Sequence, residues 1–290
     1  MQQSKKNLRS LSIAQISKKM NEDDIKVISS IKKELPRINK AIREVVNALS
    51  TAGRLFYIGA GTSGRLGYLD AAELAPTFSV FDDQVIPIMA GGKKAIYKAV
   101  EGAEDDKKAS VEELKKRKLN KNDICIGISA SGTTPFTLSA LNYAKRKKAF
   151  TILVTTGQNK QNLIYKYDIV ISPSLGEEII LGSSRLKAGT SQKIILNMIS
   201  TLSMIKLGKT YGNLMTNVAC TNEKLRKRQL NILSKELNIS EKEAHTILKS
   251  AKDDLKVSIL SQKQNISVQK AFEKLKSCAG NLEKALLTGD

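Results

Sequence analysis

The sequence predicts an α/β protein with a doubly wound, mostly parallel sheet flanked by helices. Short apolar segments alternate with helical segments between about residues 54 and 175, and the first of them runs into a glycine-rich turn. Both ends of the chain show helical periodicity without strands. We therefore expect an N-terminal helical cap at 1–50, an α/β domain at 51–215 and a small C-terminal helical subdomain at 216–290. With 290 residues, 41% of them hydrophobic, the chain can bury a full core.

The cap is expected to contain two helices. The first should run from Ser12 or Ile13 to Met20, and the second should start near residues 21–24, where four polar residues precede a helical apolar pattern. Pro36 would bend this second helix. A DNA-binding helix-turn-helix is not indicated, because no compact three-helix unit with a basic recognition helix is apparent.

Continuous apolar segments, typical of strands buried on both faces, predict the sheet. They are Leu55–Ile58, Phe78–Phe81 with Val85–Ile88, Ile124–Ile128, Thr151–Val154 and Ile169–Ile171. The helical segments between them imply parallel strands. In such sheets ligands bind beyond the carboxyl ends of the strands.

Helices are expected to fill the rest of the chain. A long apolar helix should run from about Thr190 to Leu207 and end at Gly208. The tail then shows helical segments at about 221–238, 253–263, 267–277 and 281–287, with Ser240 and Glu243 forming a capping box in front of one more helix.

Charge and composition exclude several classes of protein. The formal net charge of +20 suggests nucleic acid, but the lysines are spread along the chain and only 4% of residues are aromatic, so we expect no nucleic-acid partner. No apolar segment is long enough to span a membrane, and no signal-type segment opens the chain, which predicts a cytoplasmic protein. The cysteines at 125, 220 and 278 fit neither a disulfide framework nor a zinc site. His245 lies in a polar helical stretch, so any acid or base is expected to be a carboxylate.

Three loops rich in glycine and hydroxyl side chains stand at predicted strand ends or helix starts. They read GAGTSG at 59–64, SASGTTP at 129–135 and GSSRLKAGT at 182–190. Glycine lets a ligand approach the backbone, and the first amides of a helix attract anions. Each loop alone could consist of ordinary helix caps. Three of them together favour a compact anion such as a sugar phosphate.

A dinucleotide is the alternative ligand. Gly59, Gly61 and Gly64 satisfy the dinucleotide fingerprint, and Asp82 or Asp83 stands at about the right distance to hold a ribose. The hydroxyl-rich loop at 129–135 argues against this alternative. An ATP-type loop is not indicated, because the lysine that it requires is absent.

Two glutamates are candidate catalytic groups. Glu73 follows the first loop by about two and a half helical turns, and Glu104 lies in the acidic segment EGAED at 101–105. Glu73 could equally be a surface carboxylate, and Glu104 could be an acid that complements a helix dipole. Composition and spacing do not decide between these interpretations.

The chain resembles the N-acetylmuramic acid 6-phosphate etherase family, a branch of the sugar isomerase (SIS) domain proteins. The motifs are GAGTSGRLGYLDAAELAPTF at 59–78, AGG at 90–92, EGAED at 101–105, GISASGTTP at 127–135, GSSRLKAGTSQKIILNMIST at 182–201 and TNEKLRKRQLNI at 221–232. The related glucokinase regulatory proteins share part of the pattern.

The resemblance implies a carbon-oxygen lyase of cell-wall sugar recycling that cleaves the D-lactyl ether of N-acetylmuramic acid 6-phosphate by elimination and hydration, without a metal or other cofactor. Glu73 maps to the acid and Glu104 to the base. We expect burial beside Leu74, Pro76 and Phe78 to raise the pKa of Glu73. Phosphate and sugar contacts are expected from Thr62, Ser63, Gly64, Ser129, Ser131, Gly132, Thr134, Ser183, Arg185 and Lys187. A homodimer with the site near its interface is also implied.

Departures from the family pattern bear on affinity more than on reaction type. Thr133 stands where the family commonly has an arginine, so that Arg185 or Lys187 would have to replace the missing cation, and Leu181 stands where a threonine is usual. Two alternatives stay open: a non-catalytic regulatory protein that senses a sugar phosphate, and an NAD-type enzyme that binds a dinucleotide.

Overall fold

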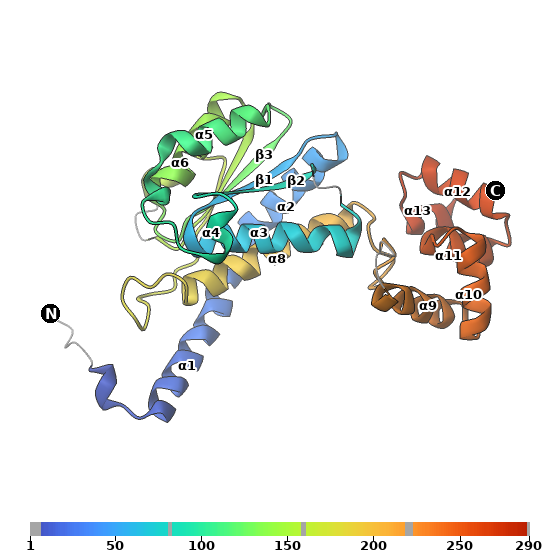
Figure 1. The fold of residues 1–290 in the computed structure, drawn as a ribbon, viewed down its shortest axis with the longest axis horizontal. Coiled ribbons are helices and arrows are strands. Elements are labelled where there is room, and N and C mark those ends of the chain that lie inside the picture. The colour runs from blue at the N-terminus through green and yellow to red at the C-terminus, as the bar shows by residue number, and fades with distance from the viewer. Residues whose placement is uncertain (1–6, 81–82, 158–160, 218–222, 289–290) are drawn as a thin grey trace.

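The computed structural model describes residues 7–80, 83–157, 161–217 and 223–288. A parallel sheet lies between two layers of helices (Figure 1). The N-terminal helix projects from this layered domain on one side, and the last helices of the chain form a separate group on another.

Among the described residues the sheet has five parallel strands in the order β2-β1-β3-β4-β5. The strands are β1 (Leu55–Gly59), β2 (Val85–Met89), β3 (Ile124–Ile128), β4 (Phe150–Val154) and β5 (Ile169–Ile171). Gly59 is in register with Met89 on one side and with Ile128 on the other. The carboxyl ends of the central strands are therefore level, so the loops that follow them meet at one edge of the sheet.

Helices cover both faces of the sheet (Figure 1). One face carries α1 (Ile13–Lys32), α2 (Leu35–Ser50), α3 (Gly61–Phe78) and α8 (Lys187–Lys206), and the other carries α5 (Lys107–Lys116) and α6 (Pro135–Arg146). Short helical elements lie between them: η1 (Leu8–Ser10), α4 (Lys94–Tyr97), η2 (Ala103–Asp105) and α7 (Gln161–Ile164). Alternate residues of β1 serve the two cores, since Tyr57 packs with the first group and Phe56 with the second.

The predicted strand at Phe78–Phe81 is wrong. Phe78 is the last residue of α3, and Ser79 ends that helix in the left-handed conformation with φ 51°. Phe78 is buried in the core below the sheet, so its apolar character serves a helix face. Phe81 lies outside the described residues. A short apolar segment fits a buried helix end as well as a strand, which explains the error.

The N-terminal helices also differ from the prediction. A capping box between Ser12 and Gln15 starts α1, which then continues through the polar residues at 21–24 without a break. The helical break comes at Lys33 and Glu34, just before Pro36, which occupies the first turn of α2. Proline suits a first turn because its missing N–H has no acceptor there. The long helix α8 begins three residues before the predicted Thr190.

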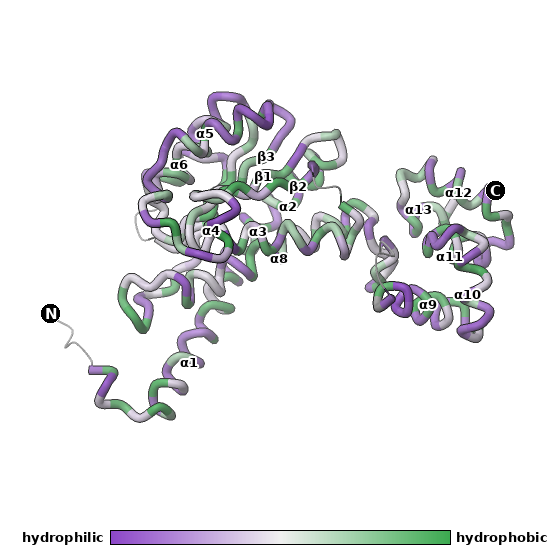
Figure 2. Tube along the Cα trace, viewed as in Figure 1, coloured by the Kyte–Doolittle hydropathy of each residue, from purple (hydrophilic) through white to green (hydrophobic). Residues whose placement is uncertain are grey.

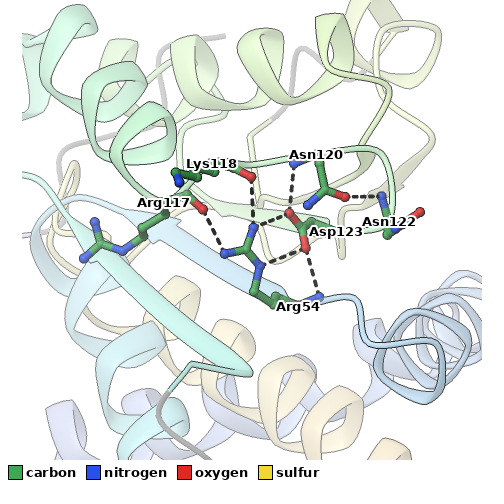
Figure 3. A network of polar contacts seen from close by, with 6 residues as sticks. All are labelled: Arg54, Arg117, Lys118, Asn120, Asn122 and Asp123. Atoms are coloured by element: carbon green, nitrogen blue, oxygen red, sulfur yellow. Dashed lines mark hydrogen bonds and ion pairs between the residues drawn. The ribbon is translucent and has the colours of Figure 1, made fainter.

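An ion pair holds the amino ends of two central strands together (Figure 3). Asp123 accepts hydrogen bonds from Arg54 Nη2 at 2.7 Å, from Arg54 Nε at 3.0 Å and from the Arg54 backbone amide at 3.0 Å. The Arg54 guanidinium also donates to the carbonyls of Arg117 and Lys118. Asp123 is 1% exposed, so its carboxylate depends on these partners.

The last helices share a core of their own. They are α9 (Glu223–Leu237), α10 (Glu241–Ser250), α11 (Leu255–Gln264), α12 (Val268–Ser277) and α13 (Leu282–Leu287). The predicted capping box of Ser240 and Glu243 starts α10. Figure 2 shows hydrophilic and hydrophobic residues alternating along α9, and Leu230 and Leu233 of this helix are buried in the shared core, as expected for a helix that buries only one stripe. Glu283 accepts a hydrogen bond from the Gly212 amide and so joins this group to the segment after α8.

Candidate functional site

The loops at the carboxyl ends of the strands enclose a cavity of about 540 Å³. Its wall includes Thr62 and Ser63 from the start of α3, together with residues from the second and third predicted loops. The first amides of α3 have no acceptor within the helix, so they are available to a ligand in the cavity. The cavity lies at the end of β1, where the sequence predicts an anion site.

Two glycines allow β1 and α3 to come this close. A Cβ on Gly59 would lie 2.7 Å from the Gly64 amide nitrogen, and a Cβ on Gly64 would lie 2.7 Å from the Gly59 carbonyl oxygen. Gly64 is buried and does not line the cavity. What Gly64 provides in the structure is the close approach of β1 and α3, and not a surface of the cavity.

The second loop supplies an ordered group of hydroxyls. Ser129 Oγ lies 2.8 Å from Thr134 Oγ1 and accepts from the Gly132 amide at 3.1 Å, which holds the turn together. Gly132 has φ +73°, a conformation that favours glycine. Ser131, Thr133 and Thr134 line the cavity, whereas Ser129 is buried beneath them.

The third loop contributes less than the sequence predicts. Ser184 lines the cavity, whereas Ser183 and Arg185 do not. The ammonium group of Lys187 is buried and donates to the carbonyls of Leu175 at 3.1 Å and Glu177 at 2.6 Å. It therefore holds the preceding loop and is not directed at the cavity.

Glu178 occupies the start of α8. Its carboxylate accepts from the amides of Lys187 at 3.0 Å and Ala188 at 2.9 Å, so these amides already have an anionic partner. No lysine or arginine lines the cavity in the part of the chain that the structure describes. Neither Arg185 nor Lys187 therefore replaces, in this cavity, the arginine that the family commonly has at the position of Thr133. A phosphate here would depend on neutral donors and helix dipoles.

Glu104 joins the loops in this cavity. It lies in η2, after Gly102 with φ +74°, and its side chain is exposed to the cavity together with Asp105. Of the residues that the structure describes, three carboxylates line the cavity: Glu104, Asp105 and Glu178. Because Glu178 is engaged by α8, Glu104 and Asp105 are the carboxylates that a ligand would meet.

Glu73 faces elsewhere. It is exposed on α3 and lines a second cavity of about 380 Å³ between α3 and α8, which we call the α3–α8 cavity. The burial that we expected is only partly present, because Leu74 and Phe78 are buried while Glu73 and Pro76 are exposed. Glu73 follows Ser63 by ten residues, which corresponds to about 15 Å along the helix. One chain by itself does not bring Glu73 and Glu104 into one cavity.

Two buried polar pairs join α3 to α8. Ser63 Oγ donates to Gln192 Oε1 at 2.9 Å, and Gln192 is fully buried. Asp70 accepts from Tyr57 Oη at 2.9 Å and from Ser200 Oγ at 3.0 Å, and burial raises the pKa of the Asp70 carboxyl. The sequence analysis missed Gln192 and Asp70. Their partners across the α3–α8 contact, Ser63 for Gln192 and Ser200 for Asp70, lie more than a hundred residues away in the chain, so helical spacing alone could not reveal these contacts.

Other sequence predictions lie outside these cavities. Asp82 is not among the described residues, and Asp83 is exposed before the amino end of β2, away from the edge where a ribose would lie. Cys125 is buried inside β3, and burial raises the pKa of its thiol. Among the described residues no group of three His, Cys, Asp or Glu side chains could hold a metal ion, and no helix is long and apolar enough to cross a membrane.

Comparison with known proteins places this chain in a family. A protein of Clostridium beijerinckii named N-acetylmuramic acid 6-phosphate etherase is 47% identical over 87% of this chain and 83% of its own length. A protein of the same name from Geobacillus thermodenitrificans is 46% identical over 87% of this chain and 85% of its own length. The chain belongs to the N-acetylmuramic acid 6-phosphate etherase family. The resemblance seen in the motifs is confirmed.

The fold agrees with this family. Residues 37–145 match the model of the glucokinase regulatory protein N-terminal SIS domain. A phosphoheptose isomerase from Francisella tularensis is 21% identical and superposes with a TM-score of 0.51, over 68% of this chain and 98% of its own. One from Neisseria gonorrhoeae is 12% identical with a TM-score of 0.50, over 66% of this chain and 98% of its own. The predicted SIS-type parallel sheet is thereby confirmed.

Proposed function

We propose that this protein is a carbon-oxygen lyase that cleaves the D-lactyl ether of N-acetylmuramic acid 6-phosphate, giving N-acetylglucosamine 6-phosphate and D-lactate, in the recycling of cell-wall amino sugars in the cytoplasm. The observation that carries the proposal is the 44–47% identity to etherases over most of the chain, combined with the cavity that Glu104 shares with the start of α3. We call the part of this cavity formed by the first amides of α3 and by Thr62, Ser131 and Thr134 the cradle. Such a cavity suits a small phosphorylated sugar.

The phosphate would be held by the first amides of α3 and by the hydroxyls of Thr62, Ser131 and Thr134. These donors fix the phosphate end of the open-chain sugar. They take no part in the reaction, and their role is to position carbon 2 of the substrate near the base.

Glu104 would remove the proton from carbon 2, which is acidic because it lies next to the aldehyde carbon. The electron pair of that C–H bond forms the double bond between carbons 2 and 3 as the bond from carbon 3 to the lactyl oxygen breaks. Glu73, entering as a carboxylic acid, gives its proton to the leaving lactate oxygen. Water then adds across the double bond. Its oxygen bonds to carbon 3 while Glu73 accepts the released proton, and Glu104 returns its proton to carbon 2.

A second copy of the chain would complete the site. Carbons 2 and 3 are adjacent, so the base and the acid must face neighbouring atoms, yet Glu104 and Glu73 of one chain line different cavities. The surface around the α3–α8 cavity also exposes Leu69, Leu202 and Ile205, whose exposed fractions are 50%, 37% and 41%. We therefore propose a homodimer in which Glu73 of one copy serves the cradle of the other, and in which the partner covers Glu73 and supplies the desolvation that favours its protonated form.

Isotope labelling tests the reaction. The protein is incubated with N-acetylmuramic acid 6-phosphate in water labelled with heavy oxygen. The expected products are D-lactate without label and N-acetylglucosamine 6-phosphate with label at carbon 3. The Glu104→Gln variant should lose exchange of the carbon 2 proton with solvent. Label in the lactate, or exchange at the native rate in the variant, would contradict the proposal.

A sugar-phosphate-sensing regulator is the second candidate, favoured by the match of residues 37–145 to a regulatory-protein domain. It predicts binding of phosphorylated sugars without release of lactate. The same incubation separates the two candidates, because a regulator would return the substrate unchanged.

A further inference from the structure

The α3–α8 cavity carries one cation that the proposed reaction has not yet used. Lys193, on the first half of α8, lines it together with Glu73. Among the described residues no carboxylate lies within 4.0 Å of the Lys193 ammonium group. This differs from Lys187, six residues earlier on the same helix, whose ammonium group is buried against carbonyls and lies 3.7 Å from Asp23. Lys193 is therefore free to meet an anion from outside.

Its neighbours hold Lys193 in place. With the Asn197 amide oriented to suit its surroundings, its oxygen accepts from Lys193 Nζ at 2.6 Å and its nitrogen donates to the Lys193 carbonyl at 3.3 Å. The positive charge of Lys193 acts to lower the pKa of the Asp70 carboxyl, but both oxygens of Asp70 already accept hydrogen bonds, from Tyr57 and Ser200. The ammonium group thus has a neutral partner on one side and open space in the cavity on the other.

The rest of the wall combines apolar side chains with the polar residues Asp70, Thr77, Ser200 and Thr201. Leu69, Leu74 and Phe78 lie on the α3 side, and Glu73 stands among them. A ligand group that suits this cavity has a small apolar part, a negative charge and an oxygen within reach of Glu73. The lactyl substituent has all three features: a methyl group, a carboxylate and the ether oxygen that must be protonated.

We infer that Lys193 binds the lactyl carboxylate of the substrate, with the methyl group against Leu69, Leu74 and Phe78. The inference rests on the proposed function and assigns a specificity residue to it. The substrate has two anionic groups, and different kinds of residue would bind them. Neutral donors of the loops would bind the phosphate, and Lys193 would bind the carboxylate. Lys193 would distinguish the ether substrate from amino-sugar phosphates without the lactyl group.

Steady-state kinetics with a competing product tests this. In Lys193→Gln the KM for N-acetylmuramic acid 6-phosphate should rise about tenfold or more, because a charged hydrogen bond is lost. The inhibition constant of N-acetylglucosamine 6-phosphate, which has no carboxylate, should stay within about twofold of its native value. Lys193→Arg keeps the charge and should recover most of the loss. Lys206→Gln, an exposed lysine on the same helix but outside the cavity, is the matched control and should change neither constant.

The possible results separate this inference from the reaction itself. Native protein that releases no D-lactate would overturn the proposed function. Native protein that releases D-lactate, with an unchanged KM in Lys193→Gln, would overturn the role of Lys193 alone. An equal rise of KM and of the inhibition constant would also overturn it, since the lysine would then act on the part that both ligands share.

Discussion

Mixing two inactive variants tests whether each site draws its acid and its base from different copies. Glu73→Gln removes the proposed acid and Glu104→Gln the proposed base, so each variant alone should show activity at or near background. When the two chains are co-expressed, a mixed dimer with shared sites has one site with both native glutamates and one site with neither. The separation of the two groups in a single chain, with Glu73 about 15 Å along α3 from the cradle, is the reason to expect this arrangement.

The expected recovery follows from counting. Random pairing makes about half of the dimers mixed, and each mixed dimer has one intact site of two, so the mixture should release D-lactate at about a quarter of the native rate per chain. A chain carrying both substitutions, mixed with either single variant, restores no intact site and is the matched control. If the mixture of single variants stays at background while mixed dimers are detected, the two glutamates act within one chain, and the reasoning from the separate cavities is refuted.

Three further outcomes are expected. Asp123→Ala should lower the free energy of unfolding by about 3 kcal/mol, measured by urea titration, because it leaves the largely buried Arg54 guanidinium without its carboxylate partner; Glu112→Gln, in an exposed ion pair, should change it by less than about 1 kcal/mol. Burial raises the pKa of Tyr167 from 10.0 to about 12, so stability present below pH 10 is lost as the pH rises through 12, and Tyr167→Phe should flatten this decline. Gly64→Ala should weaken binding of N-acetylglucosamine 6-phosphate in calorimetry, since its Cβ would lie 2.7 Å from the Gly59 oxygen; unchanged affinity would contradict the close-approach argument.

The sheet was predictable from the sequence because its strands are buried on both faces. Leu55–Ile58 and Ile124–Ile128 are apolar almost throughout, and both lie in strands of the structure. The segment Phe78–Phe81 shows the limit of this reasoning. Phe78 ends a helix, and only its packing against the core distinguishes a helix end from the start of a strand.

The candidate site was predictable where the chemistry is local. Thr62, Ser63 and Thr134 lie at helix starts beyond strands, as their glycine-rich context indicates, and they share a cavity with Glu104. Lys187 was not predictable, since its ammonium group is occupied by carbonyls of a loop about ten residues earlier. The surroundings of Glu73 depend on packing between helices and on what covers them, and no local pattern carries that information. The catalytic roles of Glu73 and Glu104 stay predictions.

The two outer strands of the sheet constrain how copies of this chain can associate. Pro87 sits in the middle of β2, the strand at one margin, and cannot donate to a further strand. At the other margin β5 is only three residues long and is followed within two residues by Pro173. Neither margin offers a long ladder of unpaired amides, so growth of the sheet from molecule to molecule is discouraged. Two copies of the chain would then have to associate through surfaces other than the sheet margins, and fibre formation by strand addition is disfavoured.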